Sequence, residues 1–188
     1  MFSRLALCLV LATPLTAEAR PQAYLLDAAQ SSVQFEVAFG PDRITGSFPV
    51  TAADVTLDFE NPSGSKVSAV LDAAAAEASF PFATQALRGP KVLDVREYPE
   101  ISFQSSAMRF KGTTAEVEGL MTIRGVTHPE ILKAELYRQK GTAPGDLDHL
   151  SVLLTGTVAR SDFGATGWSD MVSDQISMKI LVRIDRAD

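Results

Sequence analysis

Cysteine is almost absent from this chain, whose single thiol is Cys8 near the N-terminus. Arg4 precedes an apolar stretch from Leu5 to Leu15, and Ala17-Glu18-Ala19 fits a small-x-small cleavage site. This order is typical of a secretory signal peptide, which we predict over residues 1–19. Cys8 falls inside that segment, so it indicates neither a lipid anchor nor a disulfide.

Long apolar runs are also missing after the predicted signal peptide, and the first run is shorter than the roughly 20 residues that span a bilayer. We therefore expect no integral membrane span. Residues 20–188 are expected to be one exported, periplasmic domain that folds on its apolar core without disulfides. The 17 basic and 23 acidic residues give a net charge of −6 without a basic cluster, so nucleic acid is not an expected partner.

Metal-binding patterns are scarce. His128 and His149 are the two histidines, and the absence of cysteine beyond Cys8 excludes the usual Cys/His zinc site. Asp146 and Asp148 lack the glycine and terminal glutamate of a calcium loop. We expect neither a metal nor a cofactor.

A catalytic constellation is equally hard to find. Ser63-Gly64-Ser65-Lys66 matches Ser-x-x-Lys, but it falls in an expected hairpin turn instead of at a helix start. Asp170 and Asp174 are a conceivable carboxylate pair, but loop solvation or a turn explains them far better. Neither a nucleophile elbow nor a phosphate-binding glycine loop is present. The sequence therefore predicts a protein that is not an enzyme.

Period-two alternation of apolar and polar residues is abundant and indicates half-buried strands. The last one is the clearest: Ile176, Met178, Ile180, Val182 and Ile184 alternate with mostly polar neighbours. Turn residues such as Gly40-Pro41-Asp42 separate the strands. Strands are expected at about residues 24–27, 33–39, 43–50, 53–60, 67–71, 101–103, 114–123, 131–136, 152–158 and 176–184.

One short helix is predicted from Phe80 to Arg88, with Ser79 as a cap, Pro81 in the first turn and Gly89-Pro90 as the stop. Residues 138–148 contain two Gly and one Pro and indicate a long loop.

A tight turn is expected at Gly125, which adopts positive φ without a steric penalty. Pro129 lacks an N–H, so we expect the following strand to pair fully only after that residue.

These elements predict an all-β fold, an antiparallel β-barrel of about eight strands with one short helix, because closure removes exposed strand edges. A barrel of this size is either filled by side chains or just wide enough for one small ligand. Several aromatic residues fall where strands end or turn, which places them near a barrel mouth. They are Phe39, Phe80, Phe82, Phe163 and Trp168. The pattern leaves open whether their rings plug the barrel or line it.

The stretch Gly-Leu-x-Thr-Ile-x-Gly-Val-Thr-x-Pro at residues 119–129 resembles the signature of the YceI-like family of secreted, lipocalin-like proteins. Other matches follow in the family's order and span nearly all of residues 20–188. They are Tyr24-Leu25-Leu26-Asp27 with Ser32-Val33-x-Phe35, Gly46-Ser47-Phe48, Leu87-Arg88, Tyr98-Pro99-x-Ile101-x-Phe103, and Asp162-Phe163-Gly164.

The resemblance implies a lipocalin-like barrel that binds a long apolar chain, isoprenoid or fatty acyl, and it makes a homodimer plausible. Each buried methylene contributes about 0.8 kcal/mol, so a long tail needs no charged anchor for micromolar affinity. Arg88 is a candidate contact for a head group, or simply a cation at a helix end. The expected apolar lining comprises Phe35, Val37, Phe39, Phe48, Phe80, Phe82, Leu87, Phe103, Phe163 and Trp168.

The chain departs from the family pattern at the expected mouth. Phe39 stands where relatives commonly have histidine, and Glu77, Ala78 and Phe80 replace a polar stretch. Residues 89–94 replace an aromatic and acidic one. These changes favour a more apolar ligand, or else an alternative function as a stress-response or protein-interaction module with a filled barrel.

Overall fold

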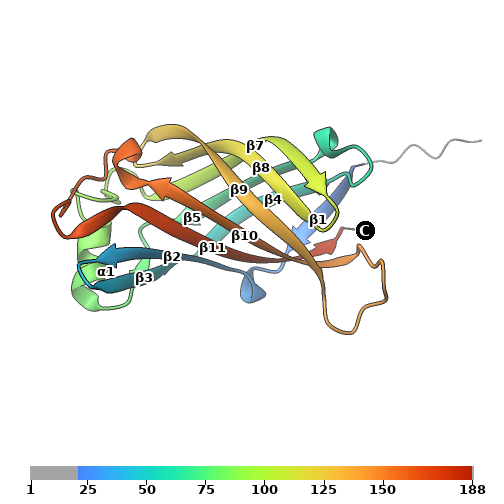
Figure 1. Ribbon diagram of the computed structural model, residues 1–188, viewed down its shortest axis with the longest axis horizontal. Helices are drawn as coiled ribbons and strands as arrows, with labels where there is room; N and C mark the ends of the chain where they lie inside the picture. The colour runs from blue at the N-terminus through green and yellow to red at the C-terminus, as the bar shows by residue number, and fades with distance from the viewer. Residues whose placement is uncertain (1–20, 188) are drawn as a thin grey trace, which may run out of the picture.

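The computed structural model describes residues 21–187, so the predicted signal peptide lies outside the described residues. It consists of strands, one α-helix and three short 3-10 turns (Figure 1). The strands are β1 (Gln22–Leu26), β2 (Ser32–Phe39), β3 (Asp42–Phe48), β4 (Val50–Leu57), β5 (Lys66–Asp72), β6 (Glu77–Ala78), β7 (Glu100–Lys111), β8 (Thr114–Ile123), β9 (Val126–Arg138), β10 (His149–Ala159) and β11 (Val172–Arg186). The helix is α1 (Pro81–Arg88), and the 3-10 turns are η1 (Ala28–Gln30), η2 (Pro62–Gly64) and η3 (Arg160–Phe163).

An antiparallel barrel closes through the first strand. The sheet order β1-β4-β5-β7-β8-β9-β10-β11 returns to β1, because β1 pairs with both β4 and β11. Tyr24 is opposite Val55 on one side and Arg186 on the other. This arrangement confirms the predicted eight-stranded barrel with one short helix, and it leaves the closing strands without free edges.

β11 has two successive partners on the same side. Its first part, from Val172 to Leu181, pairs with β2, whereas Ile184–Arg186 pairs with β1. Between β1 and β2, the chain turns away from the barrel wall at η1. Directly after η1, Ser31 Oγ accepts a hydrogen bond of 3.0 Å from Arg183 N. β2, β3 and β6 therefore extend one end of the barrel, and α1 lies beside them at that end (Figure 1).

Helix α1 begins one residue later than predicted, and the expected Ser79 cap is wrong. Phe80 occupies the N-cap position without a side-chain cap hydrogen bond. Ser79 N donates instead to Thr45 O at 2.8 Å, which ties the residue to the edge of β3. Pro81 starts the helix, where its missing N–H removes no bond.

The predicted turn between β8 and β9 consists of Arg124 and Gly125, both with positive φ, and Ile123 pairs with Val126 directly. Pairing with β8 starts at Val126 and includes Pro129, but β9 has partners on both sides only after Pro129, as expected. β9 pairs with β10 only from Lys133 onward. A missing N–H is tolerated where a strand has a neighbour on one side alone.

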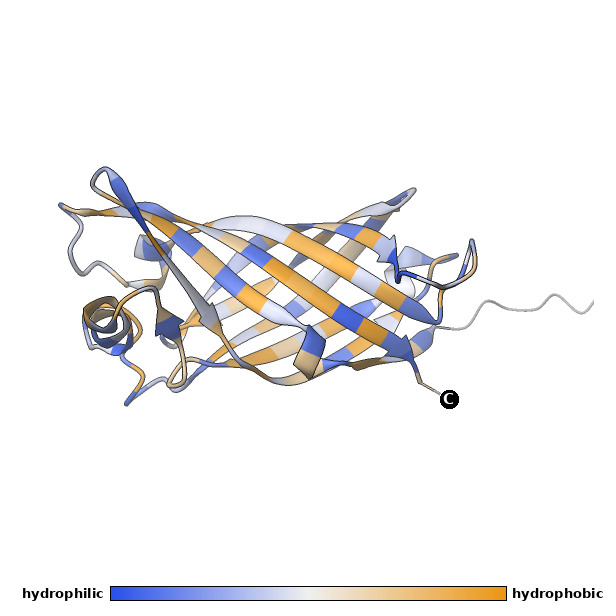
Figure 2. Cartoon of the chain, turned by 90° about the horizontal axis from the view of Figure 1, so that it is seen from below, coloured by the Kyte–Doolittle hydropathy of each residue, from blue (hydrophilic) through white to orange (hydrophobic). Residues whose placement is uncertain are grey.

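Apolar and polar residues alternate along the wall strands (Figure 2). At the end opposite α1, Phe59 and Phe110 pack against each other with ring centroids 5.4 Å apart. Tyr24 is buried there, and its hydroxyl donates to Leu147 O at 2.8 Å, which attaches the 138–148 loop. Among residues 21–187, no helix is long and apolar enough to cross a membrane.

Candidate functional site

The barrel encloses a cavity of about 490 Å³. Alternation builds its wall, because residues of one parity on each strand point inward. On β11, for example, Ile176, Met178 and Ile180 line the cavity. Four polar side chains appear among its lining residues: Ser31, Gln34, Ser102 and Arg160. The interior is therefore a nearly continuous apolar surface.

All the residues predicted as apolar lining border this cavity. They are Phe35, Val37 and Phe39 on β2, Phe48 on β3, Phe80, Phe82 and Leu87 at α1, Phe103 on β7, and Phe163 and Trp168 in the connection between β10 and β11. Since a cavity remains between them, their rings line the barrel and leave its centre hollow.

The mouth of the cavity lies at the α1 end. Three lining residues there are exposed to solvent: Phe82 at 66%, Met171 at 47% and Phe80 at 38% of their surface. Gly40 N donates to Met171 O at 3.0 Å, which joins the tip of the β2–β3 hairpin to this rim. An apolar rim at an opening gives an apolar chain a continuous path from the surface into the barrel.

Aromatic rings form much of the wall behind the rim. Phe35 and Phe48 pack against each other with centroids 5.4 Å apart and planes tilted by 42°. Phe163 is fully buried and packs with Met121 and Val158. Tilted aromatic contacts hold rings in place, so this part of the wall is largely preformed.

Arg160 is a buried cation beside the cavity that our sequence analysis missed. Its guanidinium donates to the carbonyl oxygens of Ala165, Gly167, Val172 and Ser173 at 2.5, 2.7, 3.0 and 3.0 Å. The sequence did contain one sign that Arg160 points inward. Arg160 directly follows β10 and lies two residues after Val158, so it continues the inward-facing parity of that strand. Arg160 thus holds the connection that carries Phe163 and Trp168.

Methionines were also missing from the predicted lining. Met108, Met121, Met171 and Met178 all border the cavity. Their unbranched, polarizable side chains adapt to irregular apolar shapes. The period-two pattern placed Met121 and Met178 on the apolar faces of their strands, but the predicted lining consisted mainly of aromatic residues.

Arg88 lies outside the cavity, in a shallow groove on the outer side of α1. Its Nε donates to Ala76 O at 2.8 Å, which links the end of the helix to the segment before it. The residue therefore has a structural contact, and its predicted role toward a head group stays a prediction.

The residues that depart from the family pattern fall at the mouth. Phe39, Ala78 and Phe80 border the cavity, whereas Glu77 is absent from its lining. The substitutions thus make the entrance apolar, in line with the rest of the interior.

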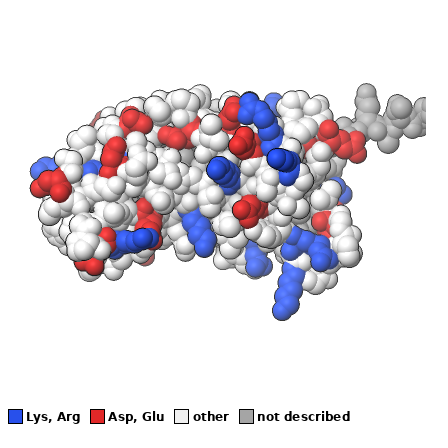
Figure 3. All heavy atoms as spheres, viewed as in Figure 1, with Lys and Arg blue, Asp and Glu red and all other residues white. Residues whose placement is uncertain are grey.

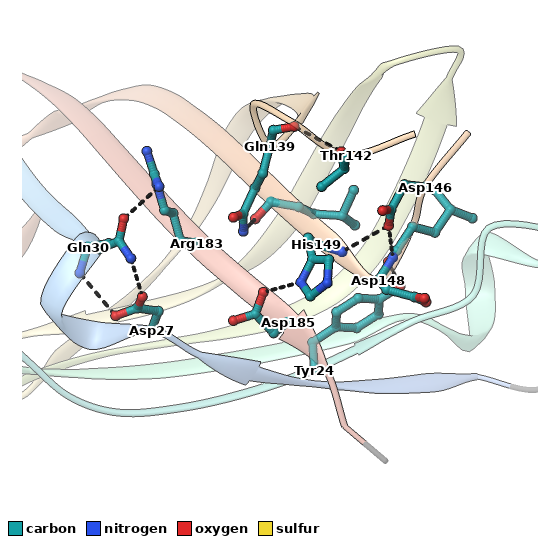
Figure 4. A network of polar contacts seen from close by, with 12 residues as sticks. Tyr24, Asp27, Gln30, Gln139, Thr142, Asp146, Asp148, His149, Arg183 and Asp185 are labelled. Carbon is teal, nitrogen blue, oxygen red and sulfur yellow. Dashed lines mark hydrogen bonds and ion pairs between the residues drawn. The ribbon is translucent and has the colours of Figure 1, made fainter. Parts of the chain in front are cut away.

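The two histidines lie far from one another along the barrel. His128 packs edge-on against Phe163, with ring centroids 5.9 Å apart. His149 lies in the polar network at the end opposite α1, where its Nδ1 is 2.8 Å from Asp185 Oδ1 (Figure 4). That hydrogen bond raises the pKa of His149. Within residues 21–187, no three His, Cys, Asp or Glu side chains are grouped to hold a metal.

Neither carboxylate of the candidate pair Asp170 and Asp174 borders the cavity. Asp174 accepts hydrogen bonds from Ser161 N at 2.9 Å and Ser161 Oγ at 2.8 Å, which fixes the turn at η3. Asp170 is exposed on the following connection.

Comparison with known proteins was made on sequence and on structure. A UPF0312 protein of Pseudomonas putida (strain W619) is 32% identical over 129 residues, which cover 68% of this chain and 67% of the relative. The crystal structure of Burkholderia cenocepacia BcnA has a TM-score of 0.75 at 19% identity, covering 84% of this chain and 98% of BcnA.

A polyisoprenoid binding domain from Saccharophagus degradans also has this fold, with a TM-score of 0.62 at 11% identity, covering 88% of this chain and 99% of that domain. A family model for the YceI-like domain matches residues 24–184, which include every strand of the closed barrel except the outermost two residues of β1 and of β11. The resemblance found in the motifs is thereby confirmed, and the chain belongs to the YceI-like family.

Proposed function

We propose that this protein is an exported, periplasmic carrier that holds one long apolar chain, isoprenoid or fatty acyl, in its barrel without changing it chemically. The observation that carries this proposal is the apolar cavity with an exposed apolar rim at the α1 end. Its volume of about 490 Å³ falls within the roughly 300–1,000 Å³ of ligand pockets in general.

The polyisoprenoid binding domain with the same fold supports this class of ligand. The energetics agree with it. A tail of about 16 carbons gains roughly 13 kcal/mol on burial at about 0.8 kcal/mol per methylene, against association costs of at least about 4 kcal/mol. Affinity in the micromolar range, about −8 kcal/mol, is thus within reach of an apolar wall alone.

Catalysis has little support in the cavity. Arg160 is the one ionisable residue on the lining, and four backbone carbonyls occupy its donors. A general acid or base needs a titrating group within reach of the substrate. A binding role therefore fits this lining better than turnover.

The test begins with native mass spectrometry of protein purified from its own periplasm, followed by extraction and identification of any released lipid. Delipidated protein is then titrated with a fluorescent acyl probe and with an isoprenoid. Ala69→Trp on β5 places an indole in the cavity and should abolish saturable binding. Ser68→Trp, on the neighbouring residue that does not line the cavity, should retain it.

Saturable, one-to-one binding that Ala69→Trp removes would support the carrier. Absence of binding to any acyl or isoprenoid probe by folded, delipidated protein would refute it. Binding that is equal in Ala69→Trp and Ser68→Trp would also refute it, since the ligand would then lie outside the barrel.

A further inference from the structure

A second hollow lies directly beside the mouth, on the outer side of α1 and the segment after it. Three cations line this groove, Arg88, Lys91 and Arg96, against the single carboxylate of Asp94. The protein as a whole has a net charge of −6, and charges of both signs are interspersed over the face in Figure 3. The groove is therefore locally positive on a protein whose net charge is negative.

The groove adjoins the barrel cavity. Phe82, Ala86 and Trp168 belong to the lining of both. Trp168 lies at the boundary between the groove and the cavity. The Lys91 ammonium lies over its ring, 5.7 Å from the centroid, and the same residue lines the apolar interior. A molecule that passes this ring leaves an apolar environment and meets a positive charge.

Backbone contacts hold the two sides of the boundary together. Gly167 N donates to Lys91 O at 2.9 Å, and a Cβ on Gly167 would lie only 2.8 Å from Lys91 Cβ. The connection held by Arg160 is therefore packed tightly onto the segment that supplies the cations. The position of the groove relative to the mouth is built into the fold.

The cations are available to a ligand. Among residues 21–187, no ion pair within 4.0 Å involves Arg88, Lys91 or Arg96. Lys91 and Arg96 are exposed, and Arg88 uses its Nε for Ala76 O. Charge-assisted hydrogen bonds from such groups to a carboxylate or phosphate are stronger than neutral ones.

We propose that this groove, with Lys91 and Arg96 as the principal contacts, binds the anionic head group of a single-chain amphiphile whose tail occupies the barrel. The ligand would end in a carboxylate or a phosphate monoester. This inference rests on the proposed carrier function and adds the polar half of the ligand, which the apolar interior does not specify. Lys91 belongs to the segment that departs from the family pattern, whereas Arg88 belongs to the Leu87-Arg88 match.

The test compares three ligands with the same tail, namely dodecanoate, dodecyl phosphate and dodecanol, in competition with a neutral fluorescent probe. At low ionic strength the two anions should bind about tenfold more tightly than the alcohol, the effect of one or two charge-assisted hydrogen bonds. The double variant Lys91→Gln/Arg96→Gln should lose this preference and keep its affinity for dodecanol. The control Lys111→Gln/Lys133→Gln changes the net charge equally at exposed sites outside both hollows and should keep the preference.

The affinity for dodecanol reports in every variant whether the barrel is intact. Equal binding of the acids and the alcohol by the unaltered protein, or a preference that survives in Lys91→Gln/Arg96→Gln, would overturn the head-group site and leave the carrier function standing. Failure of all three ligands to bind would instead contradict the carrier function itself. A preference for dodecyl phosphate alone would narrow the head group to a phosphate, and one for dodecanoate alone to a carboxylate.

Discussion

Gly46 on β3 provides the space for the ring of Phe35, its partner across the β2–β3 pair. A Cβ at Gly46 would overlap with the Cζ and Cε1 atoms of that ring and with Glu77 O on β6. A similar close approach occurs on β8, where Gly119 is opposite Ser105 and a Cβ at Gly119 would overlap with the ring of Phe103. Both rings line the cavity, so two glycines of the family motifs determine where the aromatic wall lies.

We expect Gly46→Ala to destabilise the fold by about 1–3 kcal/mol, the usual cost of inserting a methyl group into a packed site. The methyl group must both displace the Phe35 ring and move Glu77 O on β6 away, because it overlaps with each of them. Urea unfolding measures the first effect, and titration with an acyl probe measures the second. Ser47→Ala, one residue further along β3, serves as the control. If Gly46→Ala unfolded at the same urea concentration as the unaltered protein, the Phe35 ring would be able to adopt another position without cost.

Arg160→Met should lower the free energy of unfolding by about 3 kcal/mol, because hydrogen bonds to charged groups contribute roughly 1.5–3 kcal/mol each and are not additive. The variant would leave four carbonyl groups around the η3 connection without their donor. Arg160→Lys should rescue little, since an ammonium lacks the planar fork of donors.

Chemical denaturation of both Arg160 variants checks this expectation. Arg109→Met, which removes one exposed ion pair with Glu118, is the comparison and should unfold close to the unaltered protein. If Arg160→Lys proved as stable as the unaltered protein, charge alone, and not the fork geometry, would account for the role of Arg160.

Phe82→Ala tests the rim of the mouth. Phe82 is 66% exposed, so its removal should change the free energy of unfolding by less than about 0.5 kcal/mol. It should nevertheless raise the Kd for an acyl probe about fivefold, because one aromatic contact with the ligand is worth roughly 1 kcal/mol. Phe82→Leu retains an apolar side chain, so its Kd should lie between those of the unaltered protein and Phe82→Ala. An unchanged Kd in Phe82→Ala would place the entrance elsewhere.

His149 and Asp185 make stability depend on pH. Their hydrogen bond raises the pKa of His149 above its ordinary value of 6.5, so the folded state binds the proton more tightly than the unfolded state does. The pair therefore stabilises the protein fully below pH 6.5, and this contribution disappears as the pH rises through the folded-state pKa.

Urea midpoints at pH 5.5 and 8.5 measure this effect. The urea midpoint of the unaltered protein should be higher than that of His149→Gln at pH 5.5 and equal to it at pH 8.5. Asp185→Asn should behave like His149→Gln, as both remove the same pair. A difference that is larger at pH 8.5 would contradict the assignment.

Much of the fold was accessible from local patterns. The alternation in residues 176–184 depends on the strand's own geometry, and it identified the inward face of β11 correctly. The turn at Gly125 and the helix before Gly89 were found because glycine and proline act on their own backbone. The misplaced Ser79 cap shows the limit of such patterns, since Ser79 N donates to Thr45 O on the neighbouring strand β3.

The sequence by itself indicated where most strands lie, which of their faces is apolar and which family the motifs resemble, because these properties are encoded over a few neighbouring positions. It did not indicate β6, and β7 extends to Lys111, well beyond the predicted 101–103. Only the tertiary structure decided that β11 serves both β1 and β2, that the aromatic rings surround a cavity, and that Arg160 finds four carbonyl partners. It also brought Lys91 to Trp168, 77 positions away along the chain, at the edge of the mouth. Such outcomes depend on register and packing between distant segments, and a one-residue slip in register would reverse every one of those faces.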